Sequence, residues 1–105
     1  MAAAIHAYTI ITWNVRGLGL PALRQKIYAY LHRRVAYIAY IQETYIAKGE
    51  AVRLQRRWRR QIFATEASAF ARGALIWVLP GMPLETSEVK IDKDGCWVLL
   101  RGRLN

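Results

Sequence analysis

Residues 8–43 read YTIITWNVRGLGLPALRQKIYAYLHRRVAYIAYIQE and contain two apolar runs with a helical pattern between them. The first run, Tyr8 to Trp13, is rich in β-branched residues, which predicts a strand buried on both faces. Leucine and isoleucine recur at helical spacing from Leu20 to His32, and Pro21 suits the first turn of a helix. Val35 to Ile41 is again continuous and apolar, which predicts a second strand.

A strand, a helix and a strand joined by short connections form a βαβ unit, whose strands run parallel through a right-handed crossover. Asn14 and Glu43 each follow the carboxyl end of one of these strands. Because parallel strands end at the same edge of their sheet, we expect both side chains at that edge. In open α/β sheets it is the edge where ligands bind.

The pattern changes in the second half of the chain. Glu50 to Arg60 predicts a strongly basic second helix, and Asp94-Gly95 is a hairpin signal. The sequence therefore predicts an α/β (α+β) fold, with two helices on one face of a mixed sheet that starts parallel and continues antiparallel. The later strands are expected at Gln61 to Thr65, Gly73 to Leu79, Leu84 to Ile91 and Cys96 to Leu104.

Positive charge is concentrated in one region. The chain has 105 residues, enough for one domain, and its 54% hydrophobic content excludes a disordered tail. Eleven basic and two acidic residues lie between Arg16 and Arg60, as expected either of a surface for a polyanion such as nucleic acid or of a solvated helix face. The candidate nucleic-acid-binding residues are Arg16, Arg53, Arg56, Arg57, Arg59, Arg60 and Arg72.

Glu43 and Asn14 are the candidate catalytic and metal-binding residues. A carboxylate after a buried strand, at the ligand edge of a sheet, is placed to bind a hard divalent cation. Mg²⁺ commonly takes one or two protein carboxylates and completes its shell with water and phosphate oxygens. Asn14 would fix a phosphate or a water beside it. The alternative is that both residues only cap strands or turns.

Other reactive side chains are expected away from this edge. His6 precedes the first strand and His32 ends the first helix, so neither is expected to act as a base. Most tyrosines and tryptophans fall on core positions, and the single cysteine, Cys96, is expected to be buried. No apolar run or basic leader indicates a membrane span or secretion, which predicts an intracellular protein, nuclear or cytoplasmic.

Four segments together resemble the endonuclease/exonuclease/phosphatase superfamily, and most closely the apurinic-like endonuclease domains of LINE-type retrotransposons. They are Thr12 to Leu18 (TWNVRGL), Ile41 to Thr44 (IQET), Ala71 to Val78 (ARGALIWV) and Asp92 to Leu100 (DKDGCWVLL). The resemblance spans about Tyr8 to Asn105. It makes residues 1–105 the N-terminal half of such a domain, which is half of a four-layer α/β sandwich.

The resemblance also implies a chemistry. In that superfamily the residue matching Asn14 lies in the active site, and the glutamate matching Glu43 binds the Mg²⁺ that assists phosphodiester hydrolysis of DNA. The segments that supply the base and most of the remaining site do not appear in this sequence, so we expect weak activity or none from the chain alone. In the superfamily the two halves pack sheet against sheet, so the resemblance implies that this half alone leaves an apolar sheet face open. That predicts self-association or pairing with a complementary C-terminal half. The alternatives are a non-catalytic nucleic-acid-binding module, or phosphatase or phosphodiesterase action on a lipid or small phosphate.

Overall fold

Two parallel strands joined by a helix begin the fold. The computed structural model describes residues 7–66 and 72–104 and places β1 at Thr9–Asn14, α1 at Pro21–Arg33 and β2 at Ala36–Gln42. β1 and β2 pair in parallel, and Asn14 lies opposite Gln42 at the end of the pairing. The βαβ unit predicted from the sequence is therefore confirmed.

The remaining elements are one helix and four strands. α2 spans Glu50–Trp58, β3 Gln61–Ala64, β4 Ala74–Val78, β5 Leu84–Ile91 and β6 Val98–Leu104. β4 lies antiparallel between β2 and β3, which gives a four-stranded sheet in the order β1-β2-β4-β3. β5 and β6 form an antiparallel sheet of their own. The mixed α+β fold is thus as predicted, with its last two strands in a separate hairpin.

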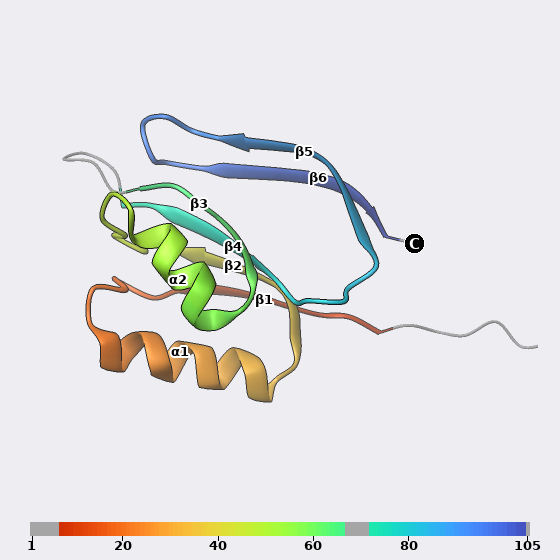
Figure 1. Ribbon diagram of the computed structural model, residues 1–105, viewed down its shortest axis with the longest axis horizontal. Helices are drawn as coiled ribbons and strands as arrows, with labels where there is room; N and C mark the ends of the chain where they lie inside the picture. The colour runs from red at the N-terminus through yellow and green to blue at the C-terminus, as the bar shows by residue number, and fades with distance from the viewer. Residues whose placement is uncertain (1–6, 67–71, 105) are drawn as a thin grey trace, which may run out of the picture.

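The helices and the hairpin lie on opposite sides of the four-stranded sheet (Figure 1). Buried residues of both helices, such as Ile27 and Leu54, join one core with Ile41, Leu75 and Trp77 of the sheet. The hairpin lies against β3 and β4. The main core is therefore the layer between the helices and the sheet.

Trp77 is at the centre of this core. Its side chain is fully buried, and the indole Nε1–H donates a hydrogen bond of 3.0 Å to the carbonyl of Ala36. The rings of Tyr28 and Trp58 pack against it, with centroids 5.8 and 5.5 Å away. This contact joins both helices to β2 and β4.

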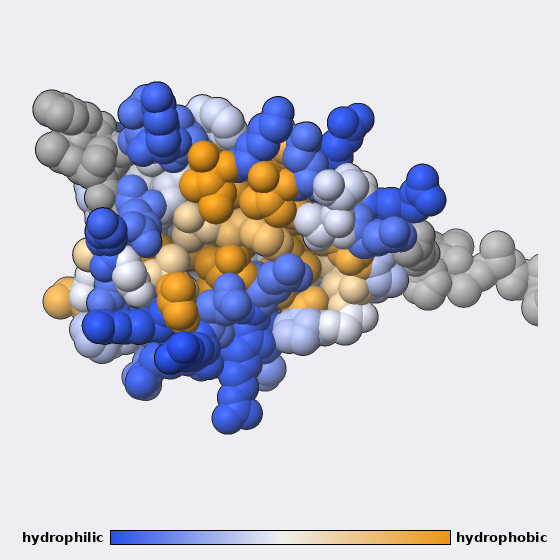
Figure 2. All heavy atoms as spheres, turned by 45° about the horizontal axis from the view of Figure 1, so that its top comes forward, coloured by the Kyte–Doolittle hydropathy of each residue, from blue (hydrophilic) through white to orange (hydrophobic). Residues whose placement is uncertain are grey.

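The prediction that the first strand is buried on both faces is wrong. Ile10 is 58% exposed, while Ile11 and Trp13 on the helix side are half-buried. The reason is that β1 is an edge strand and the hairpin covers only the β3–β4 side of the other face. Seen obliquely from the hairpin side, hydrophobic residues gather in the middle of the surface with hydrophilic residues around them (Figure 2).

α2 is shorter than the sequence predicted. It ends at Trp58 because Arg59 adopts a left-handed conformation (φ 51°), which stops the helix and turns the chain into β3.

Within residues 7–66 and 72–104, neither helix combines the length and the apolar character needed to cross a membrane.

Candidate functional site

Asn14 and Glu43 meet at the edge where β1 and β2 end. The Asn14 Nδ2 group donates a hydrogen bond to Glu43 Oε2. The Asn14 Oδ1 atom accepts the backbone N–H of Arg16 at 3.2 Å, which fixes the orientation of the amide. The two residues that the sequence assigned to one edge therefore touch.

The backbone holds Glu43 from both sides. Its N–H donates to the Gly73 carbonyl (3.0 Å), and its carbonyl accepts the N–H of Gly17 (2.7 Å). Glu43 has a left-handed conformation with φ 55°, and Arg16 and Tyr45 beside it also have positive φ. Such conformations are costly for residues other than glycine and persist where the surroundings over-determine them, often at functional sites.

Arg72 completes the cluster. Its Nη1 lies 3.2 Å from Glu43 Oε1. Among the described residues, the Asn14 amide is thus the partner of one carboxylate oxygen and the Arg72 guanidinium that of the other. The Arg72 side chain is 72% exposed and that of Glu43 22%. Sequence reasoning proposed Arg72 only as a DNA contact and missed this ion pair. The sequence carried no signal for it, because the ion pair requires β4 to lie beside β2.

The side chains at this edge fit a Mg²⁺ site in which the protein supplies few of the ligands. Mg²⁺ keeps several waters and binds proteins through as few as one carboxylate. Glu43 would supply that carboxylate, and Asn14 would hold it in place. Within residues 7–66 and 72–104 no group of three or more His, Cys, Asp or Glu side chains is arranged to bind a metal. A cation here would therefore depend on water and on phosphate oxygens for most of its ligands.

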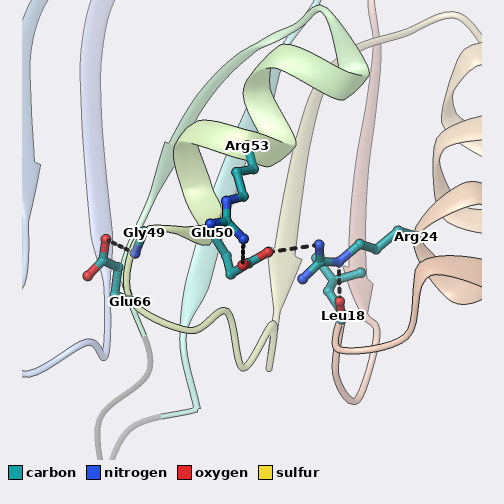
Figure 3. Close-up of polar contacts among 6 residues, drawn as sticks. All are labelled: Leu18, Arg24, Gly49, Glu50, Arg53 and Glu66. Carbon is teal, nitrogen blue, oxygen red and sulfur yellow. Dashed lines mark hydrogen bonds and ion pairs between the residues drawn. The ribbon is translucent and has the colours of Figure 1, made fainter.

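A polar network joins the loop after β1 to α2 (Figure 3). Glu50 Oε2 lies 3.2 Å from Arg24 Nη1, and its Oε1 lies 3.0 Å from Arg53 Nη1. Arg24 also donates from Nε to the Leu18 carbonyl, and Gly49 N–H, before α2, donates to Glu66 Oε1 at 3.0 Å. Arg24 thus fixes the loop that carries Arg16 and Gly17 against the start of α2.

The candidate basic residues do not form one surface. Arg16 and Arg72 lie at the Asn14–Glu43 edge, and Arg53 lies in the first half of α2, where it pairs with Glu50. α2 then runs back toward the opposite edge, because Gln61 of β3 pairs with Val78 at the far end of β4. The seven residues of β2 run from the Asn14–Glu43 edge to the opposite end of the strands, a distance of about 20 Å. Arg56, Arg57, Arg59 and Arg60 follow toward the opposite edge, where Arg57 lines a pocket with Tyr28 and Ala29 of α1 and Arg60 contacts His32.

Arg60 differs from the expectation of an exposed basic side chain. It is partly buried, with its guanidinium 5.0 Å from the centre of the Trp77 ring and 5.5 Å from that of Tyr28. The Nη2 atom of Arg60 also lies 3.0 Å from His32 Nδ1. His32 is therefore away from the Asn14–Glu43 edge, as expected. His6 lies outside the described residues. Arg60 therefore acts mainly as a packing residue.

Cys96 is exposed, and the prediction of a buried thiol is wrong. It lies in the loop between β5 and β6, where Asp92 accepts the backbone N–H of Cys96 at 3.0 Å. Partial desolvation by this loop and the negative charges of Asp92 and Asp94 raise the pKa of the thiol. Among the described aromatic residues, Tyr30, Tyr40, Tyr45 and Trp97 are also exposed rather than in the core.

Comparison of the chain with models of known protein families finds no match. What can be inferred of its function therefore rests on the motifs of the sequence and on the geometry of the Asn14–Glu43–Arg72 cluster.

Proposed function

We propose that this chain is the metal- and phosphate-binding half of a Mg²⁺-dependent DNA endonuclease domain of the LINE-type retrotransposon class. The observation that supports this best is the contact of Asn14 with Glu43 across the ends of two parallel strands. These two residues belong to the motifs that resemble the superfamily, and they lie at the edge where α/β sheets bind ligands.

Each residue of the cluster has a role in this proposal. Glu43 would hold the cation and Asn14 would fix the carboxylate, while Arg16 and Arg72 bring positive charge for a phosphodiester. When bound, Mg²⁺ supplies charge stabilisation for phosphodiester hydrolysis. Hydrolysis also needs a general base, and His32, the one histidine within residues 7–66 and 72–104, lies at the far edge. The proposal therefore includes weak activity or none from this chain alone.

The test is an NMR titration of the full chain with Mg²⁺ in the presence of a short DNA duplex. We expect Mg²⁺-dependent shifts centred on Asn14, Glu43 and Gly73, and their loss in Glu43→Gln. Glu88→Gln, on the separate hairpin, is the matched control and should shift as the wild type does. The proposal fails if Mg²⁺ leaves this edge unchanged or if Glu43→Gln responds as the wild type does.

Catalysis is tested separately by nicking of supercoiled plasmid DNA. The chain is expected to nick poorly or not at all with Mg²⁺. Robust Mg²⁺-dependent nicking that Glu43→Ala abolishes would overturn the proposal of weak activity while supporting the endonuclease assignment.

A second candidate function is a non-catalytic nucleic-acid-binding surface at the far edge. It is favoured by the exposed Arg56, Arg57 and Arg59 in the last turn of α2 and just after it, and by the contact of the neighbouring Arg60 with His32 near the end of α1. Basic residues there also compensate the negative ends of the helix dipoles, so their presence alone does not require a ligand.

The salt dependence of DNA binding tests this surface. If Arg56, Arg57 and Arg59 each contact one phosphate, replacing all three with Gln makes the dependence of log K for DNA on log salt concentration shallower, by about 2–3 units of slope. Replacing Arg16 and Arg72 with Gln instead tests whether the Asn14–Glu43 edge contacts the phosphates. Unchanged affinity and slope in the triple variant would exclude the far edge as a DNA-binding surface.

A further inference from the structure

We propose that Arg72 is an exchangeable counter-ion of Glu43, which keeps a divalent cation off the carboxylate until a phosphodiester draws the guanidinium away. This inference rests on the proposed function, because it assigns to Glu43 a cation and to Arg72 a phosphate. It predicts that the cation and the phosphate favour each other's binding.

The two partners of the Glu43 carboxylate differ in mobility. Asn14 is the last residue of β1, and its Oδ1 is held by the backbone N–H of Arg16 at 3.2 Å. Arg72 instead reaches Oε1 with a long side chain that is 72% exposed. The partner that can leave is therefore Arg72, and the oxygen that its departure frees is Oε1.

Glu43 itself has little freedom to move away from Arg72. Its backbone is bonded to Gly73 on one side and to Gly17 on the other, and its φ of 55° is fixed by those contacts. Its side chain is also much less exposed than that of Arg72, at 22%. The exchange at Oε1 therefore depends on Arg72 rather than on a change in Glu43.

Charge determines the direction of the exchange. A guanidinium and a divalent cation repel each other and compete for the same oxygen, so the ion pair lowers cation affinity. Exposed ion pairs contribute little stability, and Arg forms strong, two-pronged hydrogen bonds with phosphate. A phosphodiester near the edge would therefore take Arg72 from Glu43 at small cost. Because linked equilibria are reciprocal, the cation would raise phosphate affinity by the same factor.

The experiment measures Mn²⁺ affinity of the full chain by electron paramagnetic resonance, with dimethyl phosphate as the phosphodiester probe. We expect Arg72→Gln to bind Mn²⁺ about three- to tenfold more tightly than the wild type, since it removes both the competitor and the like charge. Arg72→Lys keeps the charge and should remain close to the wild type. Arg53→Gln, which removes a similarly exposed arginine from Glu50, is the matched control.

Dimethyl phosphate should raise the Mn²⁺ affinity of the wild type more than that of Arg72→Gln, in which only direct coordination of the cation by phosphate oxygens remains. Equal affinities in the wild type and Arg72→Gln, or no effect of dimethyl phosphate on the wild type, would overturn the exchange and leave the metal site standing. Glu43→Gln shows how much of the Mn²⁺ binding depends on Glu43. If neither the wild type nor Arg72→Gln bound Mn²⁺ in a Glu43-dependent way, the proposed function itself would be overturned.

Discussion

Gly73 accepts the backbone N–H of Glu43 at 3.0 Å, and a Cβ atom at Gly73 would lie only 2.5 Å from the Oγ1 of Thr44. Gly73 also has a positive φ of 86°. Both observations require glycine at this position, for conformation and for space. The placement of Glu43 therefore depends on a residue 30 positions later in the chain.

Gly73→Ala should destabilise the protein by about 2–4 kcal/mol, from the cost of a left-handed alanine and from overpacking against Thr44. Urea unfolding gives the free energy of unfolding. Gly81→Ala is the matched control, because Gly81 has a φ of 80° but nothing within 4 Å of its added Cβ. It should cost only about 1 kcal/mol. Equal losses in both variants would show that the contact with Thr44 is relieved by a small shift.

The local pattern of residues 8–43 was sufficient to predict the βαβ unit, because apolar periodicity and glycine positions act over a few residues. It did not predict how β1 is covered. Burial of Ile10 depends on where the β5–β6 hairpin lies, and the hairpin lies against β3 and β4 instead. Burial on the second face of a sheet is a tertiary property that the composition of one strand does not determine.

The candidate site shows the same division between local and tertiary information. The meeting of Asn14 and Glu43 follows from the parallel strands alone, so the sequence predicted it. The pairing of Arg72 with Glu43 requires β4 to lie beside β2, and the packing of Arg60 on Trp77 requires the turn at Arg59. Both arginines were therefore assigned only from their charge, and only the structure showed their partners.

Arg24→Gln should lower the free energy of unfolding by about 1–3 kcal/mol, because Arg24 ties Glu50 to the Leu18 carbonyl in a partly buried place. Arg53→Gln removes the other partner of Glu50, but this side chain is 77% exposed. We expect a change within about 0.5 kcal/mol for it. Urea unfolding of both variants compares the two partners directly. If Arg53→Gln lowered the free energy of unfolding as much as Arg24→Gln does, burial would not decide the strength of these two ion pairs.

Trp77→Phe should cost about 1–3 kcal/mol of stability, since it leaves the buried carbonyl of Ala36 without its indole partner. The control is Trp97→Phe, on an exposed side chain, with an expected change within about 0.5 kcal/mol. Thermal or urea unfolding of the two variants measures the difference. Similar stabilities of both variants would argue against an important role for the Trp77–Ala36 hydrogen bond.

The Cys96 thiol should react slowly with iodoacetamide for an exposed cysteine. Only the thiolate reacts, and desolvation together with Asp92 and Asp94 raises the pKa, so the thiolate fraction at a given pH below that pKa is smaller than in the unfolded chain. We expect the rate to rise with pH along a curve displaced to higher pH than that of the urea-unfolded protein. Asp94→Asn should move the curve toward the unfolded one, and Asp92→Asn should move it further, because Asp92 contributes more to the raised pKa. Because the thiol is exposed, the folded and unfolded rates should converge at high pH, where both are fully ionised. A folded rate that stays low there would point to restricted access instead of a raised pKa.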